Sequence, residues 1–365
     1  MLDGLDAIHW QGLSHAYGPA DDVPELLRAL AEGNCSAEEA VGEFWGNLWH
    51  QGTVYEASAY AVPFLLELVQ EEKIADREWL LMLLDSLASG SSYLDVHGAM
   101  PEQADREFQA ERKQEIDWVQ AAHEAVAKGV PVYLKLLQNE RFQMRMVAAC
   151  LLSRFPERTG ETLTMLRSSF GSETQNDVQA SLMLCLGRLG DRDADTSRAL
   201  KTALSADKAD PRRLAAALAL LWRDKTETMP AAVQVVEDVL ANESDFPTDY
   251  VFSVWDIDAD PGGTFFEALL LRGPEKAADS LLDILGRSEV SFEFLIDPLI
   301  QTNFPESKSA VTSETLTPIQ RRILTALLEA EQVWEGEKWT MGFTAKQYGL
   351  PESRQAVERL MKAEQ

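Results

Sequence analysis

The residues with the clearest spacing for chemistry lie in one acidic stretch, D-I-D-A-D-P-G-G-T-F-F-E at 256–267. Carboxylates at positions 1, 3, 5 and 12 of a loop can wrap a hard cation such as Ca²⁺. The sixth position is proline, where such a loop needs glycine for its sharp turn. The stretch therefore predicts a solvated acidic turn first and a calcium site second. The residues that would bind the metal are Asp256, Asp258, Asp260 and Glu267.

The densest aromatic cluster of the chain surrounds the stretch W-H-Q-G-T-V-Y-E at 49–56. Thr53 and Glu56 have the T-x-x-E spacing of a capping box, which predicts the start of a helix. Tryptophan and tyrosine beside histidine are also residue types that anchor protein interfaces. Packing in the core is the first interpretation, and contact with a protein partner is the alternative. The residues that would bind the partner are Trp45, Trp49, His50, Tyr55 and Glu56.

No set of catalytic residues emerges from the motifs. The five histidines are scattered, and phosphate-binding glycine loops, H-E-x-x-H and G-x-S-x-G are absent from the sequence. The three cysteines, Cys35, Cys150 and Cys185, show no paired spacing, which suits a reducing compartment. Cys150 and Cys185 lie in apolar helical runs and are expected to be buried thiols. We therefore predict no catalytic residue and no cofactor.

The charge balance is strongly acidic, with 33 basic and 60 acidic residues and a net charge of −27. Such a chain repels phosphate backbones and anionic lipid and attracts basic partners, although acidity also serves solubility. The N-terminal residues lack the pattern of a secretory signal, and no apolar run is long enough to span a membrane. These observations predict a cytoplasmic protein with a basic protein partner, no nucleic acid and no membrane.

An internal repeat organises the chain. The pattern V-P-x-x-L-x-L-x-Q-x-E occurs at 62–72 and again at 130–140. A shift of about half the distance between these two copies aligns three segments rich in alanine and leucine. These segments are 144–155, 178–189 and 212–223. Each unit of about 34 residues reads as two amphipathic helices, and neither helix can bury its apolar face alone.

The run VPVYLKLLQNERFQMRMVAACLLSRFPE at 130–157 resembles a HEAT repeat, with a proline in the first helix and R-x-x-A-A-x-x-L in the second. The resemblance implies an all-α fold, a right-handed αα superhelix of HEAT-like repeats with a helical C-terminal cap. The expected domains are a repeat solenoid at 1–300 with a helical insertion at 91–128, and a linker and cap at 301–365. T-P-I-Q at 317–320 predicts a capping box at the start of the cap.

A looser resemblance is carried by W-H-Q-G-T-V-Y-E-A-S-A-Y-A-V-P-F-L, by L-T-P-x-Q-R-R and by Y-G-L-P-x-S-R. It is to a group of bacterial HEAT-repeat proteins without an established activity, so it implies no mechanism. Among enzymes of similar fold, di-iron hydroxylases need more His-Glu pairs and DNA glycosylases need a basic groove, whereas bilin lyases have no signature to test.

Charge, scaffold and the lack of a catalytic set together favour a non-catalytic interaction scaffold. The most specific version of this hypothesis is an immunity-type inhibitor or adaptor that binds a basic protein. The alternative is a HEAT-like enzyme, such as a lyase acting on a bound small molecule or chromophore. A third interpretation is a scaffold in which the insertion at 91–128 is the docking element.

Overall fold

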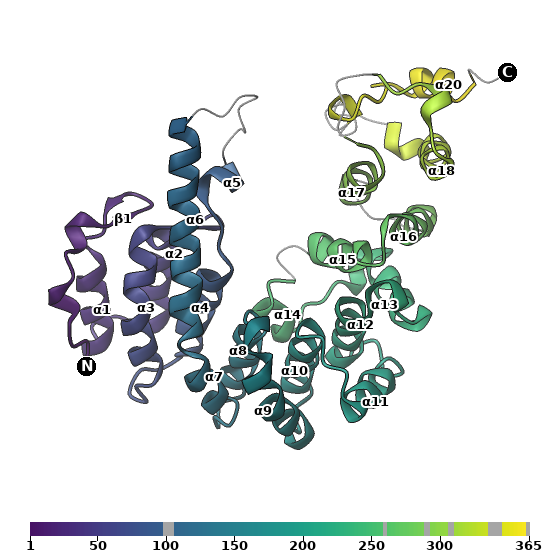
Figure 1. Cartoon of the computed structure of the whole chain (residues 1–365). Coiled ribbons are helices and arrows are strands. Elements are labelled where there is room, and N and C mark those ends of the chain that lie inside the picture. The colour runs from purple at the N-terminus through teal and green to yellow at the C-terminus, as the bar shows by residue number, and fades with distance from the viewer. Residues whose placement is uncertain (98–105, 258–260, 288–292, 306–309, 335–344, 363–365) are drawn as a thin grey trace. The chain divides into compact units, whose positions relative to one another are not determined.

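The computed structural model describes residues 1–97, 106–257, 261–287, 293–305, 310–334 and 345–362 (Figure 1). The described residues are mostly helical, and their strands form two short antiparallel pairs. The predicted all-α class is thereby confirmed. Within these residues no helix has the length and apolar composition needed to cross a membrane.

The chain divides into two compact units, Met1–Leu189 and Gly190–Gln365. We call them unit 1 and unit 2. This division follows the density of contacts and does not test the predicted domains at 1–300 and 301–365, which stay a prediction.

In its described residues, unit 1 combines ten α-helices with both strand pairs. The strands are β1 (Ser14–His15), β2 (Gly18–Pro19), β3 (Trp49–His50) and β4 (Thr53–Val54). The helices are α1 (Val23–Glu32), α2 (Ala37–Asn47), α3 (Glu56–Val69), α4 (Glu78–Ser89), α5 (Tyr93–His97), α6 (Arg106–Ala127), α7 (Val130–Leu136), α8 (Phe142–Leu152), α9 (Thr159–Ser172) and α10 (Asn176–Arg188).

Neighbouring helices of unit 1 pack as pairs, α1 with α2, α3 with α4, α7 with α8 and α9 with α10. The second helices also contact one another, so α8 lies between α4 and α10. The last seven residues of α8, from Met146 to Leu152, are all buried. Pro63 lies inside α3 and Pro131 in the first turn of α7, as the repeat predicts.

Near the start of α4, α8 and α10, a polar residue bonds the end of the preceding helix or the turn that follows it. Arg77 donates to the Val69 carbonyl, Arg145 to the carbonyls of Asn139 and Glu140, and Gln179 to the Glu173 carbonyl. The last carbonyls of a helix lack intrahelical partners, so these side chains satisfy groups that would otherwise be exposed or unpaired. The repeated position thus fixes the angle between the two helices of a pair.

The insertion predicted at 91–128 contains α5 and the long helix α6, which packs along α3 and α4 (Figure 1). Its second half supplies Ala122 and Val126 to the core, whereas Ile116, predicted on the same apolar stripe, is 37% exposed. The Glu115 carboxylate is buried and accepts from the Leu94 backbone N–H at 2.8 Å. The insertion is therefore part of the core of unit 1.

The regular secondary structure described in unit 2 is helical. Its α-helices are α11 (Ala194–Ala203), α12 (Pro211–Asp224), α13 (Pro230–Leu240), α14 (Tyr250–Val254), α15 (Pro261–Leu270), α16 (Pro274–Arg287), α17 (Glu293–Asn303), α18 (Pro318–Glu329) and α20 (Arg354–Lys362).

The helices of unit 2 pack in chain order, with α11 on α12, α12 on α13, α15 on α16, α16 on α17 and α18 on α20. The predicted capping box opens α18: the Gln320 N–H donates to the Thr317 hydroxyl, and the Thr317 N–H donates to the Gln320 side chain. Pro318 occupies the first turn, where its missing N–H costs nothing. This prediction is confirmed.

All three cysteines are free thiols, and Cys150 and Cys185 are fully buried as predicted. Burial raises the pKa of both thiols. Cys35 is partly exposed, and burial together with the nearby Glu39 carboxylate raises its pKa as well. None of the three therefore has the lowered pKa of a nucleophilic cysteine.

We predict that Arg145→Met destabilises unit 1 by about 3–5 kcal/mol, since it leaves a buried carboxylate without its cation. The Arg145 guanidinium donates to both oxygens of Glu173, and the two side chains are 14% and 9% exposed. Urea titration, read by hydrogen exchange in α8 and α10, measures the change in unit 1. The matched control is Arg158→Met, whose exposed pair with Glu161 should contribute about 0.5 kcal/mol or less.

The cost of Arg145→Met should also depend on pH. Burial raises the pKa of Glu173, but the hydrogen bonds from Arg145 and from the Gln175 and Thr174 N–H groups outweigh it and lower the pKa. A lowered folded-state pKa stabilises above the ordinary carboxyl pKa and is lost as pH falls through the folded value. The cost should be full at pH 7 and shrink below about pH 4. If Arg145→Met lowered the free energy of unfolding at pH 7 no more than Arg158→Met does, the predicted contribution of the Arg145–Glu173 pair would be contradicted.

Candidate functional site

The candidate site is built on the hairpin of β3 and β4, between α2 and α3. Trp49 pairs with Val54 and His50 with Thr53. The two turn residues, Gln51 and Gly52, have φ of 49° and 91°. A two-residue hairpin of this kind needs positive φ at both positions, which glycine adopts freely and glutamine does not. The hairpin places the Trp49 and His50 side chains on opposite faces.

The predicted capping box of Thr53 and Glu56 is wrong. Thr53 lies in β4, fully buried, and its hydroxyl donates to the His50 carbonyl at 2.7 Å. The Ser58 hydroxyl instead accepts the N–H of Tyr55, the residue that precedes α3. A carboxylate oxygen of Glu56 accepts from the N–H and hydroxyl of Ser14, at 3.3 and 3.4 Å. Glu56 thus joins α3 to β1 and has a structural role.

The two tryptophans of the prediction serve packing. Trp45 on α2 donates from its indole nitrogen to the Ser86 hydroxyl on α4, at 3.1 Å. Its ring also meets Trp79 edge to face, with 5.9 Å between centroids. Trp49 lies beside Gly90 at the end of α4, where an added Cβ would be 3.4 Å from its ring. Both side chains tie neighbouring elements together.

His50 faces a second hairpin, which sequence reasoning missed. The β1 and β2 strands are joined by a turn that contains Tyr17, whose side chain is the most exposed large hydrophobic group described, at 72%. The Tyr17 and His50 rings meet edge to face, with 5.4 Å between centroids. Two hairpin tips distant in sequence therefore present one aromatic surface.

A partly buried hydrogen-bond network holds the hairpin of β1 and β2 in place. The Nε2 atom of His15 lies 3.0 Å from an Asp22 oxygen, and the other oxygen accepts from the Asn47 amide at 3.0 Å. The Tyr17 N–H donates to Nδ1 of His15, and the Ala16 N–H donates to the Asn47 carbonyl. This network ties the turn that carries Tyr17 to the end of α2.

Tyr55 and Tyr93 complete the surface. Burial raises the pKa of Tyr55, and its hydrogen bond with Thr53 opposes this. The nearby groups Tyr93, Glu115 and Tyr17 raise the pKa further, so that the net shift is upward. The Tyr55 hydroxyl lies 2.8 Å from the Thr53 hydroxyl. Tyr93, at the start of α5, is 49% exposed. We call Tyr17, His50, Tyr55 and Tyr93 the tyrosine surface.

In the network behind this surface, His15 is not placed to act as a general base. A general base needs a free lone pair on its imidazole. Since His15 donates to a carboxylate through one ring nitrogen and accepts a backbone N–H at the other, both of its nitrogens are occupied. Half-exposed tyrosine rings, held rigidly and with hydroxyls at hand, are instead typical of protein-contact surfaces.

The predicted metal site falls partly outside the described residues, which exclude Asp258 and Asp260. Asp256 follows α14 with φ of 57°, and α15 begins at Pro261, so Glu267 lies in its second turn. A calcium loop has a turn rather than a helix at that sixth position. Among the residues that the structure describes, no group of three or more His, Cys, Asp or Glu side chains is placed to hold a metal. The metal site stays a prediction.

Comparison with protein-family models, with curated proteins and with solved structures gave no match.

We predict that Gln51→Asn stabilises the hairpin by about 0.5 kcal/mol, because asparagine tolerates positive φ better than glutamine and favours this turn. The midpoint of thermal unfolding should rise. Gln109→Asn, on the exposed face of α6, is the matched control and should lower the midpoint slightly, since asparagine is a poorer helix former. Equal effects of the two substitutions would show that the turn is not strained.

Proposed function

We propose that the protein is a non-catalytic interaction scaffold that binds a basic protein through the tyrosine surface, as an immunity-type inhibitor or adaptor. The observation that carries the proposal is the exposure of Tyr17, which is held against His50 by a partly buried network. Ordering an exposed ring in the free protein lowers the entropic cost of binding.

The scaffold that we propose is a right-handed αα superhelix of HEAT-like repeats, ending in a helical cap. The packing of consecutive helices as pairs, and the contacts among α4, α8 and α10, support it. The tie from the start of each second helix to the preceding helix also recurs at the repeat spacing. Repeat scaffolds of this kind present extended surfaces to partners.

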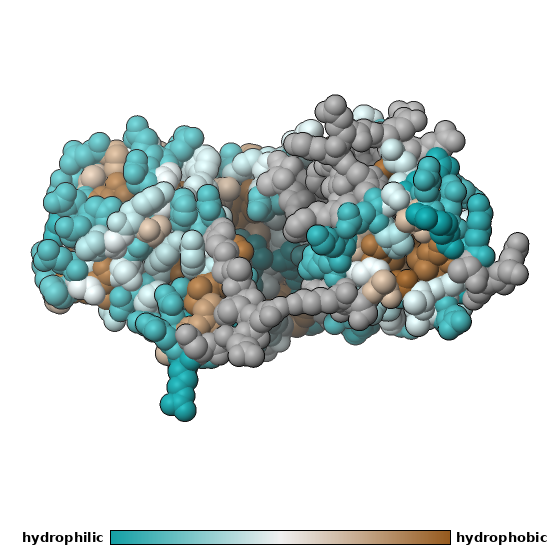
Figure 2. Space-filling model, turned by 90° about the horizontal axis from the view of Figure 1, so that it is seen from above, coloured by the Kyte–Doolittle hydropathy of each residue, from teal (hydrophilic) through white to brown (hydrophobic). Residues whose placement is uncertain are grey.

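The basic character of the partner follows from the net charge of −27. Long-range attraction of this kind raises the association rate and weakens with salt. On the face seen in Figure 2, hydrophilic residues predominate and hydrophobic ones form small separate patches. Such a face suits a partner recognised by charge and a few aromatic anchors. The same charge opposes nucleic acid as a partner.

The test is capture of the partner from native lysate by the tagged full chain, with washes at low and high ionic strength. We expect one basic protein, released by salt. The paired substitution Tyr17→Ser and Tyr93→Ser should weaken its binding at least about tenfold, since interface anchors contribute more than 1.4 kcal/mol each. Tyr250→Ser is the control, because Tyr250 is 40% exposed in unit 2.

Capture that is unchanged by the paired substitution would contradict the site, and a complex that survives high salt would contradict the electrostatic part. An absorbance spectrum of the purified protein distinguishes the alternative function, a lyase, from the proposed scaffold. A bound chromophore or small molecule, without a protein partner, would favour the lyase.

A further inference from the structure

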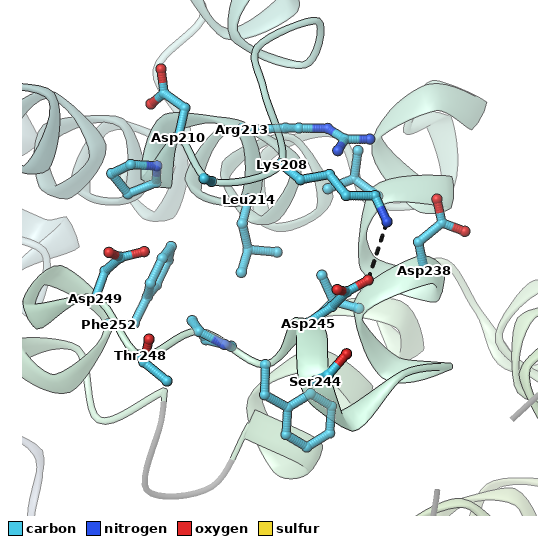
Figure 3. A pocket seen from close by; sticks show the side chains of 16 residues that line it. Lys208, Asp210, Arg213, Leu214, Asp238, Ser244, Asp245, Thr248, Asp249 and Phe252 are labelled. Atoms are coloured by element: carbon cyan, nitrogen blue, oxygen red, sulfur yellow. Dashed lines mark hydrogen bonds and ion pairs between the residues drawn. The ribbon is translucent and has the colours of Figure 1, made fainter. Parts of the chain in front are cut away.

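A cavity of about 360 Å³ lies in unit 2, within the size range of small-molecule sites. It opens between the start of α12, the end of α13 and the segment 244–252 that leads into α14. Leu214, Val235 and Phe252 give it an apolar wall, each at most 8% exposed. Figure 3 shows Leu214 between two polar ends of this cavity.

One end of the cavity holds Arg213. Its Nε–H is buried and has no hydrogen-bond partner in the described residues. No hydrogen bond or ion pair joins the rest of its guanidinium to another described residue either. A buried donor without a partner costs about 1–3 kcal/mol, so an acceptor that reached it would bind favourably.

The absence of a described partner for Arg213 differs from what the repeat shows in other helix pairs. Arg77, Arg145 and Gln179, at the corresponding position of three other helix pairs, all donate to a carbonyl at the end of the preceding helix or in the turn that follows it. The connection before α12, 204–210, is longer than those before α8 and α10, 137–141 and 173–175, but the one before α4, 70–77, is longer still. Arg77 keeps its carbonyl partner after that longest connection, so among these positions the lack of a described partner is particular to Arg213.

Three carboxylates around the cavity, those of Asp210, Asp238 and Asp245, already pair with cations other than Arg213. The Arg212 guanidinium lowers the pKa of Asp210, and Lys208 pairs with Asp245 at 3.2 Å. Burial raises the pKa of Asp238, but hydrogen bonds from Gln234 and Arg287 outweigh this and lower it. Asp249 also has an interaction partner. Figure 3 shows Arg213 and Lys208 at the same end of the cavity.

We propose that this cavity binds a small carboxylate carried on an apolar group, with the carboxylate on Arg213 and the apolar group against Leu214, Val235 and Phe252. A guanidinium and a carboxylate form strong, often bidentate hydrogen bonds. The ligand is either a free short-chain acid or the last residue of a chain that ends in an apolar side chain. Both sources offer the same chemistry to the site.

Calorimetric titration of the full chain tests the proposal, with octanoate as the free-acid probe and a short peptide that ends in leucine as the other. Each probe has a neutral amide as its control. We expect at least one carboxylate to bind and its amide to bind at least tenfold more weakly. The acid that binds better shows whether the ligand is a free acid or the end of a chain. This comparison needs no variant, so it stands even where a substitution disturbs folding.

Arg213→Gln should weaken binding of the carboxylate at least tenfold, with the amide unaffected. Arg198→Gln removes one positive charge from an exposed pair elsewhere in unit 2 and should bind as the wild type does. Circular dichroism checks that both variants are folded. The proposal is overturned if neither carboxylate binds, if the amides bind equally well, or if a folded Arg213→Gln variant retains wild-type affinity.

Discussion

The structure depends on one constraint: the second helix of a pair is apolar on too many sides to be covered by its partner alone. In α8 the run from Met146 to Leu152 is buried throughout, because α4, α7 and α10 cover it from three directions. Pairs must therefore stack, and the polar residue at the start of each second helix sets how they do so. Arg145, which holds Glu173 and two carbonyls at once, is the most strongly bonded example.

Much of the helical fold could be predicted because its signals are local. Periodic apolar residues located the second helices, the T-P-x-Q pattern located the start of α18, and apolar runs around Cys150 and Cys185 indicated their burial. The T-x-x-E pattern of Thr53 and Glu56 failed because Thr53 pairs in a strand and the Glu56 carboxylate finds Ser14, far away in the sequence. A pattern of four residues does not contain such a long-range partner.

The candidate site was predictable in part for the same reason. The cluster around His50 is visible in the sequence, but its most exposed member, Tyr17, belongs to another hairpin that is brought there by His15, Asp22 and Asn47. Gln51-Gly52 is a weaker turn signal than Asn-Gly, so the hairpin of β3 and β4 was not expected. Trp45 and Trp49, the residues most typical of interface anchors, serve as packing between α2, β3 and α4.

The Nε–H of Arg213, which has no partner in the described part of the chain, has a consequence for how this architecture changes over time. In three other helix pairs the polar side chain at this position bonds a carbonyl of the preceding helix or turn. A different path of one turn removes that carbonyl and leaves both helices in place. The same position can therefore serve as a structural tie in one pair and as a binding group in another, and surface turns tolerate the changes in sequence that this requires.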